Sequence, residues 1–112
     1  MLPPFDDRGH LPPGIHRCSV EELAERFGHG SPERRVEMSE LREFFAWCRQ
    51  EGIVRVLING SFTTARKSPN DVDVVVRLGN ESRFDKDRWQ DEAARWPFLH
   101  LALAMNDDDY LA

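Results

Sequence analysis

The chain has 112 residues, of which 40% are hydrophobic and 31% are charged, a composition typical of one soluble domain. Its 20 acidic residues outnumber its 15 basic ones and give a net charge of −5, which argues against a dedicated binder of duplex DNA. The longest apolar run is interrupted by Arg55 and is far too short to span a bilayer, so we expect no membrane partner. Prolines and Asp6-Asp7 stand where a signal peptide would be basic and then apolar, and we therefore expect a cytoplasmic protein.

The beginning of the chain is predicted to be irregular. Pro3-Pro4 and Pro12-Pro13-Gly14 fit neither a helix nor a central strand. We therefore divide the chain into an irregular N-terminal segment, residues 1–18, and one domain, residues 19–112. The segment either wraps around the domain or is loose.

Two helices are predicted in the first half of the domain. A capping box over Ser19 to Glu22 begins a short helix that ends near Phe27. Ser31-Pro32 begins a long helix, which Gly52 ends. The apolar stripe of the long helix contains Met38, Leu41, Phe44, Phe45, Trp47 and Cys48. The acidic residues between Glu33 and Glu51 are expected to form a solvated face.

The second half is predicted to contain the sheet. Branched residues indicate a strand over Ile53 to Ile58, and a short helix is expected from Phe62 to Lys67. A second strand follows over Val72 to Leu78, then a third helix over Asp85 to Trp96 and a third strand over Phe98 to Met105. This order predicts an α/β (α+β) fold, with a small mixed sheet of about three or four strands and helices packed on it.

The stretch that carries chemistry is Gly60-Ser61, followed after nine residues by Asp71-Val72-Asp73. Alternation along a strand puts Asp71 and Asp73 on one face, about 6.5–7 Å apart at the backbone. Their carboxylates can converge on one divalent cation, and their mutual repulsion is a local cost that suggests a functional site. A glycine and a serine after a strand can place amides and a hydroxyl around a phosphate. Together these residues predict metal-assisted phosphoryl or nucleotidyl transfer.

A family resemblance rests on the same residues. Ile58-Asn59-Gly60-Ser61 with Asp71-Val72-Asp73-Val74 resembles the signature of the nucleotidyltransferase superfamily in its minimal bacterial form. Leu11 to His16, Arg26 to Gly28 and Gly60 to Ala65 are similar to a group of small bacterial nucleotidyltransferase-like proteins, and the matches span about residues 11–78. The resemblance implies that Gly60 and Ser61 hold the triphosphate of a nucleoside triphosphate. It also implies that Asp71 and Asp73 bind Mg²⁺ or Mn²⁺.

The implied activity is transfer of a nucleoside monophosphate from a nucleoside triphosphate to a hydroxyl on a protein or an RNA. The implied partners are a partner protein or a transfer RNA acceptor, in a toxin–antitoxin or defence pair, and a homo-oligomer is left open. Active members of the superfamily usually carry a third carboxylate on the third core strand, whereas Phe98 to Met105 contains no acid. The alternative is therefore a catalytically inactive nucleotide-sensing or partner-binding module. A third option is a structural or antitoxin-like subunit that binds no nucleotide.

Other polar residues near the expected site are open to two interpretations. Arg66 and Lys67 either neutralise triphosphate charge or lie on a solvated helix face, and we include Lys67 among the nucleotide-binding candidates. The four histidines show no ligand pairs at the spacing of a zinc site, so no zinc is expected. His100 is either a hydrogen-bonded histidine at the end of the sheet or a base in place of the missing acid.

Overall fold

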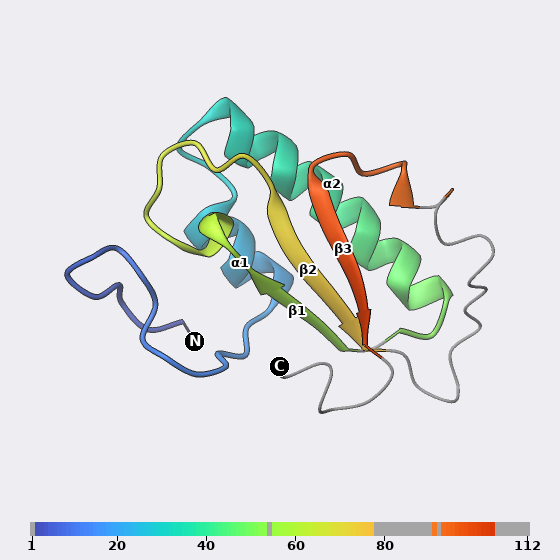
Figure 1. Cartoon of the computed structure of the whole chain (residues 1–112), viewed down its shortest axis with the longest axis horizontal. Helices are drawn as coiled ribbons and strands as arrows, with labels where there is room; N and C mark the ends of the chain where they lie inside the picture. The colour runs from blue at the N-terminus through green and yellow to red at the C-terminus, as the bar shows by residue number, and fades with distance from the viewer. Residues whose placement is uncertain (1, 54, 78–90, 92, 105–112) are drawn as a thin grey trace.

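The structure is a computed structural model, and it describes residues 2–53, 55–77, 91 and 93–104. Its elements are α1 (Val20–Phe27), α2 (Pro32–Gln50), β1 (Arg55–Asn59), the 3₁₀ helix η1 (Ser61–Thr63), β2 (Val72–Arg77) and β3 (Leu99–Ala104). Within these residues the strands form a three-stranded sheet in the order β1-β2-β3, with β1 antiparallel and β3 parallel to β2. The long helix α2 runs behind the sheet (Figure 1). The predicted α+β fold with a small mixed sheet is confirmed.

Both predicted helix starts are confirmed. Ser19 and Glu22 form the capping box of α1, in which each side chain accepts from the other residue's backbone N–H. The Ser31 hydroxyl accepts from the third N–H of α2, and Pro32 occupies the first helical position. In the part of the chain that the structure describes, neither helix combines the length and the apolar character needed to cross a membrane.

The hydrophobic core lies between the two helices and one face of the sheet. Leu41 and Phe44 of α2 are fully buried in the core. They share it with Val72, Val74 and Val76, the alternate residues of β2 whose side chains face the helices. Trp96 is also fully buried, and its ring meets that of Phe44 edge-on with 5.2 Å between centroids. The third helix was predicted over Asp85 to Trp96, and most of that range lies outside the described residues. Its predicted end is wrong, because residues 94–95 form a turn and Trp96 is not helical.

The first strand differs from its prediction at both ends. It was expected over Ile53 to Ile58, and it runs over Arg55–Asn59. The backbone N–H of Ile53 donates to the carbonyl oxygen of Cys48 at 2.8 Å, so Ile53 belongs to the turn that ends α2. Its side chain still enters the core, which explains why it continues the apolar pattern of the strand.

The short helix expected from Phe62 to Lys67 is not formed. The chain makes one 3₁₀ turn over Ser61–Thr63 and continues as a loop. The hydroxyl of Thr64 donates to the carbonyl oxygen of Ser61 at 2.6 Å. The side chain of buried Arg34 donates hydrogen bonds to three further carbonyl oxygens of this segment. These side-chain donors occupy the acceptors that a helix would need, and they override the local helical pattern.

The N-terminal segment packs against the domain. Residues 2–18 contain no helix and no strand beyond a single antiparallel bridge between His10 and Thr64. The carbonyl oxygen of Gly9 accepts from the backbone N–H of Ala65 at 2.9 Å, and the ring of Phe5 packs on the core. The segment therefore lies against the loop that follows β1.

Candidate functional site

Asp71 and Asp73 lie on the face of the sheet that the helices do not cover. Val72 and Val74 are 0% and 1% exposed in the core, whereas Asp73 between them is exposed and Asp71 is half-buried. The alternation predicted for this strand is therefore confirmed. The two carboxylates share one accessible surface.

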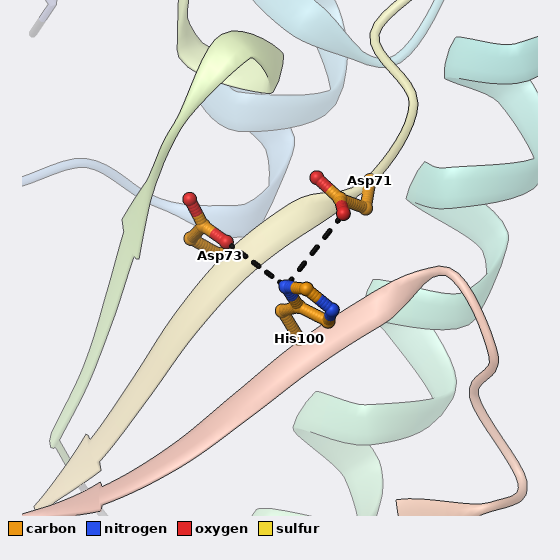
Figure 2. Close-up of side chains that lie close together, drawn as sticks. All are labelled: Asp71, Asp73 and His100. Atoms are coloured by element: carbon orange, nitrogen blue, oxygen red, sulfur yellow. Dashed lines mark ion pairs between the residues drawn. The ribbon is translucent and has the colours of Figure 1, made fainter.

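His100 of β3 is the third member of this cluster. The parallel register places it opposite Asp73, and Nδ1 of His100 lies 3.6 Å from Oδ2 of Asp71 and 3.6 Å from Oδ1 of Asp73 (Figure 2). The side chains are 73% exposed in His100, 42% in Asp71 and 53% in Asp73, so a ligand can reach all three. Of the two interpretations that the sequence allowed for His100, neither anticipated a position between the two acids.

The donor atoms of this Asp71–Asp73–His100 cluster lie within 4.8 Å of one another. The separations of 3.6 Å are too long for hydrogen bonds. They suit ligands of one cation, because two ligands each bound at about 2.1 Å lie roughly 3–4 Å apart. The carboxylate oxygens suit Mg²⁺ and Mn²⁺ equally, whereas an imidazole nitrogen is a more typical ligand of transition metals. The residues present therefore fit a divalent cation, and the imidazole favours Mn²⁺ over Mg²⁺.

The turn after β1 lies directly against the cluster. Antiparallel pairing places Asn59 opposite Asp73, and Gly60 follows with φ 86° and ψ −164°, a conformation that is almost confined to glycine. A Cβ atom added to Gly60 would lie 2.6 Å from Oδ2 of Asp73. The backbone conformation and the close approach both require glycine here. The glycine of the sequence motif is thus placed beside a carboxylate of the same motif.

A hollow of about 650 Å³ adjoins this turn. It is lined by two segments of the chain, namely Arg8, Gly9 and His10 from the N-terminal segment and Gly60, Ser61, Thr64, Ala65 and Arg66 from the loop after β1. Gly60 lines the hollow, and a Cβ atom added to it would meet the carboxylate of Asp73, so the hollow and the cluster are neighbours. Lys67, a candidate from the sequence, is exposed and is not among the lining residues.

Arg34 of α2 anchors the loop that lines the hollow. Its side chain is buried, and burial lowers its pKa. The guanidinium donates to four backbone carbonyl oxygens, those of Phe27 at 3.0 Å, Phe62 at 2.7 Å, Thr64 at 2.6 Å and Arg66 at 2.6 Å. The planar, five-donor geometry of arginine suits this task. Sequence reasoning missed Arg34, although its position on the apolar stripe of α2 was a signal.

Glu37 is a second buried charged residue of α2, one turn from Arg34. The expectation of a solvated acidic face is wrong at this position, because the side chain is fully buried. Neither carboxylate oxygen has a hydrogen-bond partner among the described residues. Burial raises the pKa of Glu37 to about 7; the charge of Arg34 opposes this, while Asp71, Glu33 and Glu40 add to it. Glu37 therefore holds a proton up to about neutral pH.

Replacing Glu37 with glutamine is expected to stabilise the protein above neutral pH. The folded-state pKa of about 7 lies above the ordinary value of 4.5, so the folded state binds more protons between these values and its stability falls as pH rises. Glutamine removes this loss, and the free energy of unfolding at pH 8 should exceed that of the wild type by about 3 kcal/mol. Urea unfolding between pH 5 and pH 8 measures the difference. Parallel pH profiles for the wild type and Glu37→Gln would exclude the explanation, and Glu43→Gln, at an exposed position of the same helix, is the control.

The fold and the site define a small α+β protein with an exposed carboxylate–histidine cluster and an adjoining basic hollow. Residues 3–108 match the model of a family described as a family of unknown function (DUF6932), and the chain belongs to that family. The match includes the N-terminal segment as well as the sheet. No curated protein and no solved structure matches the chain significantly.

Proposed function

We propose that this protein is a metal-dependent nucleotidyltransferase that moves a nucleoside monophosphate from a nucleoside triphosphate to a hydroxyl group. The observation that carries the proposal is the convergence of Asp71, Asp73 and His100 on an exposed sheet face beside Gly60 and its hollow. Ligands for a cation next to a space for phosphates are the parts that such a transfer needs. The resemblance of the motif to the nucleotidyltransferase superfamily supports the same assignment.

In the proposed reaction, the acceptor hydroxyl oxygen attacks the α-phosphorus of the nucleoside triphosphate. A new phosphorus–oxygen bond forms to the acceptor, the bond to the oxygen that bridges to the β-phosphate breaks, pyrophosphate leaves, and the hydroxyl proton passes to solvent. Asp71, Asp73 and His100 would hold a divalent cation, which would supply positive charge to offset the negative charge of the phosphates. Ser61 and the backbone at Gly60 orient the phosphates, and the exposed face leaves room for the acceptor.

The proposed acceptor is a hydroxyl of a partner protein or of a transfer RNA end, and the proposed setting is a cytoplasmic toxin–antitoxin or defence pair. The net charge of −5 disfavours duplex DNA as the acceptor. A single RNA end or a protein side chain needs no extended basic surface, and it can reach the open face of β2 and β3.

A label-transfer assay tests the proposal. The wild-type chain is incubated with each nucleoside triphosphate labelled at the α-phosphate, and the acceptor is the chain itself, purified transfer RNA or a candidate partner protein. We expect transfer of the label in Mn²⁺, transfer several-fold slower in Mg²⁺ because the ligands include an imidazole, and none in EDTA. A nucleotide labelled at the γ-phosphate should transfer nothing, which separates this reaction from phosphorylation. Absence of both transfer and metal-dependent nucleotide binding by calorimetry would contradict the proposal.

A second candidate function is a nucleotide-sensing or partner-binding module without turnover. One observation favours it: β3 carries no carboxylate over Leu99–Ala104, and His100 stands on the strand where active members of the resembling superfamily have an acid. Such a module would bind nucleotide with the cation in calorimetry and transfer no label with any acceptor. The same experiment therefore separates the two functions.

A further inference from the structure

We propose that the N-terminal residues Asp6 to His10 complete a binding site for a triphosphate chain, with Arg8 and Arg66 as its two cationic groups. The inference rests on the proposed function, because it names the part of the nucleotide that the hollow holds. It adds to the site the irregular N-terminal segment, which lies outside the domain predicted over residues 19–112.

The segment Asp6 to His10 has a fixed shape on the loop. The Asp6 carboxylate accepts from the backbone N–H groups of Arg8 at 2.9 Å and His10 at 3.0 Å, and the Asp6 N–H donates to the His10 carbonyl oxygen at 2.7 Å. These bonds close a tight turn. The turn is joined to the loop by the bond from the Ala65 N–H to the Gly9 carbonyl oxygen at 2.9 Å. The backbone that carries Arg8 is therefore held beside the hollow.

The contact between turn and loop requires a glycine. Gly9 has φ 77°, and a Cβ atom added there would lie 2.9 Å from Cβ of Ala65. Gly14, in the same N-terminal segment, also has a positive φ of 115°, but a Cβ atom added there would meet nothing within 4 Å. Gly14 is therefore a matched control for Gly9. A larger residue strains the backbone at either position, but only at Gly9 does it also push the turn away from the loop.

The charges on the hollow favour an anion. Among the described residues, its lining contains Arg8, Arg66 and His10, the hydroxyl of Ser61 and no acidic residue. Among the residues that the structure describes, neither Arg8 nor Arg66 forms an ion pair, and both are exposed. The carbonyl oxygen of Arg66 accepts from Arg34, so the backbone that carries this cation is also held by the fold. Two arginines on one concave wall provide several donors for phosphate oxygens.

The position of the hollow selects a chain of phosphates over a single one. Its volume of about 650 Å³ is within the range of small-molecule sites. It meets the cluster at Gly60, so a ligand that binds the arginines at one end and a cation held by Asp73 at the other would be extended and anionic along its length. A triphosphate chain has this form. We therefore expect affinity to increase from phosphate to pyrophosphate to tripolyphosphate.

Calorimetry with inorganic tripolyphosphate in EDTA tests the site without the cation and without turnover. Arg8→Ala and Arg66→Ala should each weaken binding about tenfold, because each removes charged hydrogen bonds. Gly9→Val should weaken binding by a similar factor through loss of the docked turn. Gly14→Val and Arg42→Ala, which change a glycine of the same segment and an exposed arginine of α2, should bind like the wild type.

The outcomes distinguish this inference from the proposed function. Absence of tripolyphosphate binding, or equal binding by the wild type and the Arg8 and Arg66 variants, would overturn the inference while label transfer could still be found. Arginine-dependent binding without label transfer would support the inference and count against the transferase. ATP and AMP are tested in the same way. If the site holds the triphosphate of a nucleotide, ATP should lose affinity in the Arg8 and Arg66 variants as tripolyphosphate does, and AMP should bind poorly to every variant.

Discussion

Replacing Asp73 with asparagine is expected to lower label transfer by at least about a thousandfold while leaving the fold intact. Asparagine keeps the size of the side chain but removes the charge of one of the proposed cation ligands, which lies beside Gly60. The same change relieves repulsion between two carboxylates on one face. The variant should therefore be at least as stable as the wild type in EDTA, so loss of activity would not reflect unfolding.

The melting temperature in Mn²⁺ gives a second readout that does not depend on finding the acceptor. A cation that binds only the folded state stabilises it, so Mn²⁺ should raise the melting temperature of the wild type and not that of Asp73→Asn. Val75→Thr alters the next position on the same face of β2 and is the matched control. If Asp73→Asn retained the Mn²⁺ shift and transferred label within tenfold of the wild-type rate, Asp73 would not be a cation ligand.

The sequence predicted those parts of the site that depend on local geometry. Strand alternation is a property of a few consecutive residues, and it placed Asp71 and Asp73 on one face correctly. The approach of His100 depends on a parallel pairing between β2 and β3, which are separated in the chain by more than twenty residues. A pattern within one strand contains no information about this register. His100 could therefore be noticed but not placed.

The two buried charges of α2 were missed for a different reason. Arg34, Glu37, Leu41 and Phe44 recur at helical spacing, so the charged pair continues the apolar stripe toward the start of the helix. Charged residues are almost never fully buried unless paired, and a general rule therefore assigned Glu37 to solvent. A tertiary contact explains the exception. The carbonyl oxygens of a loop about 30 residues away in the chain need a hydrogen-bond donor, and Arg34 supplies it.

Replacing Arg34 with methionine is expected to reduce the free energy of unfolding by about 3–5 kcal/mol. Methionine has a similar length, but it leaves the carbonyl oxygens of Phe27, Phe62, Thr64 and Arg66 without their donor. It also leaves buried Glu37 without the nearby positive charge that favours its ionised form. Because small domains are stable by only about 5–15 kcal/mol, the variant should be marginal in urea unfolding. Arg35→Met, at the adjacent exposed position, should change stability by less than about 0.5 kcal/mol.

Arg34→Lys separates the anchoring of the loop from general stability, since an ammonium group keeps the charge and loses the planar fork. The charge near Glu37 is preserved, so this variant should remain folded. Its single nitrogen cannot reach the carbonyl oxygens of the loop in the same arrangement, and Arg66 should no longer be held beside the hollow. We therefore expect Arg34→Lys to bind tripolyphosphate several-fold more weakly than the wild type at a temperature where both are folded. Wild-type affinity in a folded Arg34→Lys variant would show that the loop keeps its shape without the arginine.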